Sequence, residues 1–249
     1  MIDMLKKIAR TKRFKDIVSF ISFTVLLILF FIFSGTKYIQ INTNFWSNNN
    51  FASPNETLFT SANRNIFNIE YRYLAVTILL ILVIKFGYKI YQYHKKDDQK
   101  YINDLDSNLN SMIYSVLVVF ICLMTGLQDI STIVLVLVSS FVGLKLISSN
   151  KKEKIDGLGS LKIVGILLTL VSWLLIIVYS LGTIVYGNVR STWYVYVLDL
   201  IGLAYFIFLV IDMPRYIGKF KRGNQEFIKY CLDLLLKVGF FIVLLIGIN

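Results

Sequence analysis

The sequence predicts an all-α membrane protein, a single bundle of seven transmembrane helices spanning residues 1–249. Three observations predict it. Hydrophobic residues make up 56% of the chain and charged residues only 16%, which is typical of proteins that cross a bilayer several times. Apolar runs of membrane-spanning length recur along the whole sequence. Lysine and arginine gather in alternate connections between these runs, as positive-inside topology requires.

Seven apolar runs define the expected helices, and each approaches the roughly 20 residues that cross a hydrocarbon core. They are residues 17–33, 73–91, 109–127, 130–148, 161–185, 192–211 and 227–248. Only Gln128 and Asp129 separate the third run from the fourth, so these two helices are expected to form a tight antiparallel pair. The charged stretch 95–106 is expected to be a solvated connector.

The distribution of basic residues predicts the orientation. Twenty-one Lys and Arg residues flank one side of the expected bundle, and four, Lys37, Arg64, Arg72 and Arg190, flank the other. This asymmetry places the N-terminus in the cytoplasm and the C-terminus outside a cell membrane. The net charge of +11 is thereby explained as a topology signal, and no nucleic-acid partner is expected. Alternating residues 38–42 and a turn-prone stretch 47–50 predict a short β-hairpin in the outside loop 35–71.

A lysine lies near the middle of the last run. At that depth Lys237 costs roughly 2.5–3.5 kcal/mol on insertion scales, so it needs a partner. Asp233 is four residues earlier and shares its helix face. The two residues either form a neutralising ion pair or keep an amine reactive toward a carbonyl, and on a seventh helix the second interpretation suggests retinal. Lys85, in the second run, is expected to snorkel to the cytoplasmic surface.

Topology and local motifs together resemble the heliorhodopsin family. Residues 115–143, SVLVVFICLMTGLQDISTIVLVLVSSFVG, are similar to the family's apolar run, Thr-Gly or Cys-Gly, Ile-x-Asp-Ile and second apolar run. Residues 171–174 (VSWL) are similar to its Val-Pro-Trp-Ile, and residues 212–216 (DMPRY) to its Gln-Tyr-Leu-Gln-Tyr. The spacing from Glu226 to Lys237 is also similar. The match covers most of the chain, and its specificity lies in the order and spacing of the motifs.

This resemblance implies that all-trans-retinal is bonded to Lys237 as a Schiff base. It further implies a light-absorbing homodimer that does not pump ions. In such a light sensor we expect the signal to pass to the cytoplasmic face, which is rich in Lys and Arg, or to a partner. The family's helix-three glutamate counterion falls on Leu109, and its helix-seven serine falls on Asp233. We therefore predict that the compensating negative charge has moved to helix seven, with Asp233 as counterion.

Four further residues are candidates for the chromophore site. Trp173 would contact the ring end of retinal, and Tyr205 belongs to an aromatic stretch of helix six. Ser111 and Ser140 can tune a chromophore through hydrogen bonds. Each residue also has an ordinary structural interpretation, because tryptophans and small polar residues are common where membrane helices pack together.

Two other functions stay open at this point. Asp199 and Asp233 lie at different depths, which suggests a light-gated or passive proton conductor on the same scaffold. Leu109 at the counterion position instead favours a scaffold that has lost its chromophore. The sequence contains no phosphate-binding loop, metal-ligand spacing or catalytic triad pattern, and both cysteines lie in apolar runs, so the chain is not expected to be an enzyme.

Overall fold

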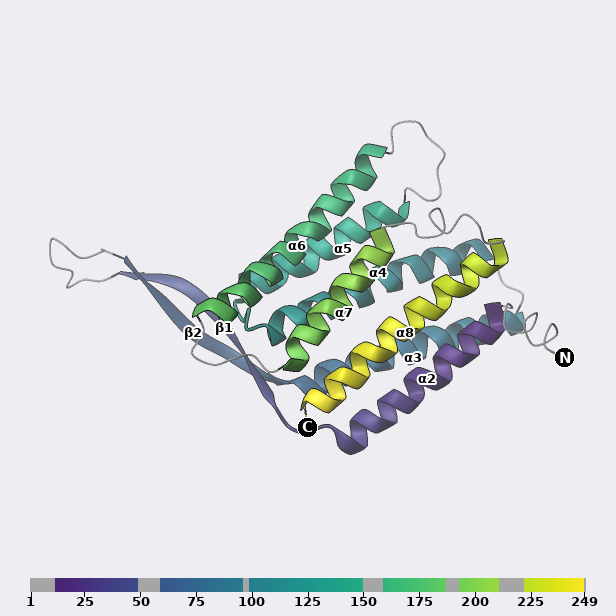
Figure 1. The fold of residues 1–249 in the computed structure, drawn as a ribbon, viewed down its shortest axis with the longest axis horizontal. Helices are drawn as coiled ribbons and strands as arrows, with labels where there is room; N and C mark the ends of the chain where they lie inside the picture. The colour runs from purple at the N-terminus through teal and green to yellow at the C-terminus, as the bar shows by residue number, and fades with distance from the viewer. Residues whose placement is uncertain are drawn as a thin grey trace.

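A computed structural model describes residues 12–48, 59–95, 99–149, 159–186, 193–210 and 222–248. Within these ranges the chain forms seven helices and one pair of strands. The helices are α2 (Lys12–Phe33), α3 (Tyr71–Lys95), α4 (Gln99–Met124), α5 (Ile130–Ser149), α6 (Gly159–Tyr186), α7 (Trp193–Val210) and α8 (Arg222–Ile248), and the strands are β1 (Tyr38–Asn48) and β2 (Phe59–Glu70). Consecutive helices run in opposite directions, and the strand pair projects from one end of the bundle (Figure 1). We call this end the hairpin end.

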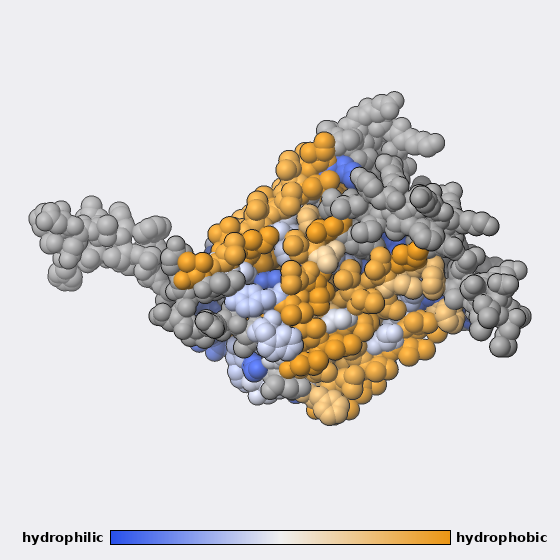
Figure 2. Space-filling model, viewed as in Figure 1, coloured by the Kyte–Doolittle hydropathy of each residue, from blue (hydrophilic) through white to orange (hydrophobic). Residues whose placement is uncertain are grey.

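The helices have the length and surface of a membrane bundle. Five of them, α2, α3, α5, α6 and α8, are long and apolar enough to cross a membrane, while the apolar parts of α4 and α7 are shorter. Large apolar side chains point outward along α6, α7 and α8, among them Leu174, Val178, Leu200, Leu235 and Ile246. Figure 2 shows the apolar surface that they help to form. Outward-facing apolar side chains on helices of this length are typical of a surface that contacts lipid.

The expected β-hairpin is confirmed. Strand β1 pairs antiparallel with β2, with Ile39 opposite Ile69 and a register shift after Ile41. Both Ile39 and Ile41 are buried at the base of the hairpin, where the amide of Asn42 donates to the carbonyl of Gln128 over 2.9 Å. The hairpin is therefore fixed to the α4–α5 connection. Of the predicted turn 47–50, the first half belongs to β1 and the second half lies outside the described residues.

The tight connection between α4 and α5 follows from its residues. Gly126 adopts a φ of 99°, a left-handed conformation that glycine reaches without strain. Asp129 then caps α5, because its carboxylate accepts a hydrogen bond from the amide of Thr132 over 3.1 Å.

The stretch 95–106 was expected to be a connector. Most of it is helical, because α4 begins at Gln99, several residues before the apolar part of this helix. The motif 212–216 and the basic residues before Lys12 lie outside the described residues.

Helices α5 and α6 pack closely because small residues face each other. A Cβ atom on Gly143 would lie 2.3 Å from Thr169 Oγ1 and 2.6 Å from the carbonyl oxygen of Gly165. Both distances are below van der Waals contact, so only glycine permits this approach. Ser139 and Ser140 bond to the hydroxyl of Ser172 in the same interface, over 2.7 and 2.9 Å.

Gly143→Ala is therefore expected to destabilise the bundle by about 2–3 kcal/mol, because the added methyl group forces α6 away from α5. Gly239→Ala is the matched control, since a Cβ there meets no atom within 4 Å and alanine has the higher helix propensity. Unfolding of the two purified variants in a denaturing detergent series measures the difference. Equal stability of the two variants would contradict the close-packed interface.

Candidate functional site

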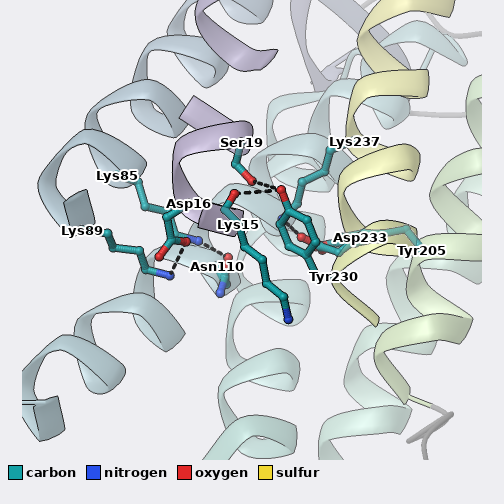
Figure 3. A network of polar contacts seen from close by, with 10 residues as sticks. All are labelled: Lys15, Asp16, Ser19, Lys85, Lys89, Asn110, Tyr205, Tyr230, Asp233 and Lys237. Carbon is teal, nitrogen blue, oxygen red and sulfur yellow. Dashed lines mark hydrogen bonds and ion pairs between the residues drawn. The ribbon is translucent and has the colours of Figure 1, made fainter. Parts of the chain in front are cut away.

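Lys237 and Asp233 form an ion pair between a buried amine and a carboxylate whose side chain is 31% exposed. Both lie on α8, four residues apart, so successive turns place their side chains on one face. The amine is only 5% exposed, and its Nζ donates to Asp233 Oδ2 over 2.8 Å. The other carboxylate oxygen accepts a hydrogen bond from the Tyr205 hydroxyl on α7, also over 2.8 Å. The carboxylate thus compensates the buried amine and ties α8 to α7 (Figure 3).

A small cavity adjoins this amine. Residues of α4, α7 and α8 line about 20 Å³ of space, which is room for about one water molecule. The residues that line it are mainly aromatic and aliphatic, and they include Tyr114, Leu117, Ile121, Gly202, Tyr205 and Phe240 beside Lys237. The amine therefore faces a protein interior that is apolar except for its tyrosines.

Trp173 on α6 lies next to Tyr114 and Gly202, two residues that line this cavity. It is 1% exposed, and its Nε1 donates to the Tyr114 hydroxyl over 2.9 Å. Its ring stacks with that of Phe206 at a centroid distance of 6.4 Å. A Cβ on Gly202 would lie 2.7 Å from the Trp173 ring, so this glycine allows the indole to reach the cavity wall. Tyr114, which the sequence did not single out, connects Trp173 to Tyr205, whose ring centroid is 5.3 Å from its own.

The remaining predicted site residues lie apart from the amine. Ser140 is buried in the α5–α6 interface, where it donates to Ser172. Ser111 is buried and Leu109 is partly buried, and both lie about the middle of α4. Among the residues that the structure describes, none of these three lines the cavity.

The expectation for Lys85 is wrong. Its side chain is 4% exposed, donates to the amide oxygen of Asn110 on α4, and interacts electrostatically with Asp233. Because Asn110 and Asp233 offer oxygen partners inside the bundle, the amine has no need to snorkel out to the membrane surface.

A polar cluster extends from Asp233 toward the end of the bundle opposite the hairpin, which we call the basic end. We define the polar cluster as Asp16, Ser19, Lys85, Lys89, Asn110 and Tyr230 (Figure 3). The Tyr230 hydroxyl is 3.2 Å from Ser19 Oγ and donates to the carbonyl of Lys15 over 2.8 Å. Sequence reasoning missed this cluster, although one signal was present. Tyr230, Asp233 and Lys237 recur at helical spacing and form a polar stripe on an otherwise apolar helix.

Asp199 occupies a separate position on α7, in the half of the bundle nearer the hairpin. One carboxylate oxygen accepts from the Ser180 hydroxyl over 3.0 Å, and the other is buried without a hydrogen-bond partner among the described residues. Asp199 is not among the described residues that line the cavity beside Lys237.

The arrangement brings together a buried amine, a carboxylate and hydroxyl donors. No group of three or more metal-binding side chains occurs within the described ranges. Comparison of the sequence with models of known protein families gives no match, and comparison with curated proteins gives none either.

Proposed function

We propose that this protein is a retinal-binding light sensor of the heliorhodopsin type, with Lys237 as the attachment residue. One observation carries the proposal: the Lys237 amine points inward, is almost fully buried, and lies between a carboxylate and an aromatic cavity. An amine in this position can react with an aldehyde to form an imine, and a neighbouring carboxylate stabilises the positive charge of the protonated imine. When bound there, retinal would supply light absorption and photoisomerisation.

The side chains around Lys237 have the chemical properties that a retinal site needs. Asp233 supplies the negative charge, and Tyr205 orients that carboxylate by donating to its second oxygen. Trp173 and Tyr114 supply flat aromatic surface behind the cavity. A long polyene needs far more space than about 20 Å³, so binding has to open the contacts among α4, α7 and α8.

We propose seven membrane crossings with the N-terminus in the cytoplasm. This orientation is supported by Arg13, Lys89, Lys145, Lys162 and Lys229, which all lie in the halves of their helices toward the basic end. The basic end then faces the cytoplasm, where a signalling partner would bind. The homodimer that the resemblance implies stays a prediction.

Chemical trapping of the attachment site tests the proposal. Membranes containing the protein are incubated with all-trans-retinal and treated with borohydride, which reduces an imine to a stable secondary amine. Mass spectrometry of the digest is expected to find the retinyl group on the α8 peptide at Lys237. An adduct on Lys85, the other buried lysine of this region, or no adduct at all would contradict the assignment.

A further inference from the structure

Asp199 lies on α7 among residues that offer it little polar contact. Its neighbour Leu198 is fully buried, and Gly202, about one turn later, lies against the ring of an α6 tryptophan. One carboxyl oxygen, Oδ2, is 3.0 Å from the Ser180 hydroxyl on α6. The other, Oδ1, is buried and has no hydrogen-bond partner within the described residues. Asp199 therefore has one hydrogen bond, where an ionised carboxylate accepts about four.

The helices around Asp199 provide no positive charge in the half of the bundle nearer the hairpin. Helix α7 packs against α8 and α4, and the Ser180 contact joins it to α6. Residues 238–248 of α8, 111–124 of α4 and 173–186 of α6 contain no charged side chain. From α4, Cys122 interacts electrostatically with Asp199, but a thiol carries no positive charge in either protonation state.

Two lysines reach toward this half of the bundle, and both have other partners. Lys237 is 2.8 Å from Asp233. Lys37 donates to a backbone carbonyl near the end of α8 over 3.1 Å and lies over the Tyr194 ring at 6.0 Å. Tyr194 precedes Asp199 by five residues, which turns it about 140° around the axis of α7. Neither lysine is among the groups that act electrostatically on Asp199.

This environment suits a neutral carboxylic acid better than a carboxylate. Burial without a compensating cation disfavours the charged form of an acid. A protonated Asp199 can donate its O–H to Ser180 Oγ across the same 3.0 Å, because a serine hydroxyl accepts as well as donates. The unpaired Oδ1 is then a carbonyl oxygen, and an unpaired carbonyl costs far less than an unpaired charge.

We propose that Asp199 is a proton-binding site, occupied at neutral pH, and that its bound proton stabilises the contact between α6 and α7. The two helices also meet where the Trp173 ring stacks with Phe206. In alkaline solution the proton combines with hydroxide to give water, and the remaining charge requires hydration that only a separation of α6 from α7 provides. The site needs no chromophore, so it can hold or fail independently of retinal binding.

Infrared spectroscopy of the purified protein at neutral pH tests whether the site is occupied, because the C=O stretch of a carboxylic acid is separate from the bands of carboxylates. The spectrum of the wild type minus that of Asp199→Asn is expected to contain a carboxylic-acid band. Asparagine has the size of the neutral acid, so this variant is expected to fold. Asp233→Asn is the matched control, and its difference spectrum should contain carboxylate bands, since Asp233 pairs with Lys237. Carboxylate bands in the Asp199→Asn difference would overturn the proposal.

Two substitutions of Ser180 test where the proton points. Ser180→Ala removes the acceptor, so the acid band is expected to stay and to move to higher frequency. Ser180→Thr keeps a hydroxyl group and should leave the band close to its wild-type position. A band at the same frequency in the wild type and in Ser180→Ala would contradict the hydrogen bond on which the site depends.

Hydrogen exchange tests the coupling to the helix contact. At neutral pH, peptides from 173–186 and 193–202 should exchange at similar rates in the wild type and in Asp199→Asn. At the alkaline pH where the acid band disappears, the wild type is expected to exchange roughly tenfold faster there, the ratio that a difference of about 1.4 kcal/mol in local opening produces. Peptides from α2 serve as the internal control. Equal exchange of the two proteins at that pH would show that the proton does not stabilise the contact.

Discussion

Replacing Lys237 with alanine is expected to abolish the visible absorption band that all-trans-retinal produces with the wild-type protein. The variant lacks the amine that lies beside the cavity, and no other nitrogen nucleophile is among the residues that line it within the described part of the chain. The measurement is an absorption spectrum of membranes from expressing cells before and after addition of retinal. A band that persists unchanged would exclude Lys237 as the attachment residue.

Two controls separate loss of the amine from loss of the fold. Lys85→Met removes the other buried lysine of this region and is expected to keep the band, because Lys85 interacts with Asn110 and is not among the cavity-lining residues. In Lys237→Ala itself, butylamine added with retinal should restore absorption, since it supplies an amine in the space that the side chain vacated. If wild-type protein stays colourless and Lys237→Met is no less stable, the chromophore-free scaffold becomes the better hypothesis.

Asp233→Asn is expected to move the retinal absorption from the visible to the near ultraviolet at neutral pH. Asparagine keeps the size of the side chain but removes the negative charge, and the imine nitrogen then holds its proton less tightly in a low-dielectric interior that also contains Lys85. The visible band should return as the solution is acidified, because only the protonated imine absorbs there. A spectroscopic pH titration of the variant against the wild type measures the effect.

Asp199→Asn is the matched control for this substitution. Its carboxylate bonds to Ser180 and lies on the hairpin side of the cavity, so the spectrum should stay close to that of the wild type. If Asp233→Asn instead keeps its visible band at neutral pH, a different carboxylate must compensate the imine. Asp16 in the polar cluster would then be the next candidate, because it is a buried carboxylate near Tyr230.

Hydropathy and spacing predicted the secondary structure well where one periodic signal dominates. Apolar runs require helices in lipid because a helix satisfies its own backbone hydrogen bonds, and the alternation at 38–42 correctly indicated a strand. The extension of α4 back to Gln99 was missed, since polar residues outside the bilayer give hydropathy no signal.

The sequence by itself determined that Lys237 and Asp233 share a face, because both residues lie on one helix and its geometry fixes their separation. Only the tertiary structure decided what meets that face. The partners of the pair come from other helices: Tyr205 from α7, Tyr114 and Trp173 behind the cavity, and Lys85 with Asn110 on the polar side. Rotation of each helix about its axis sets these contacts, and that rotation depends on how all the side chains pack together, which no single run of residues specifies.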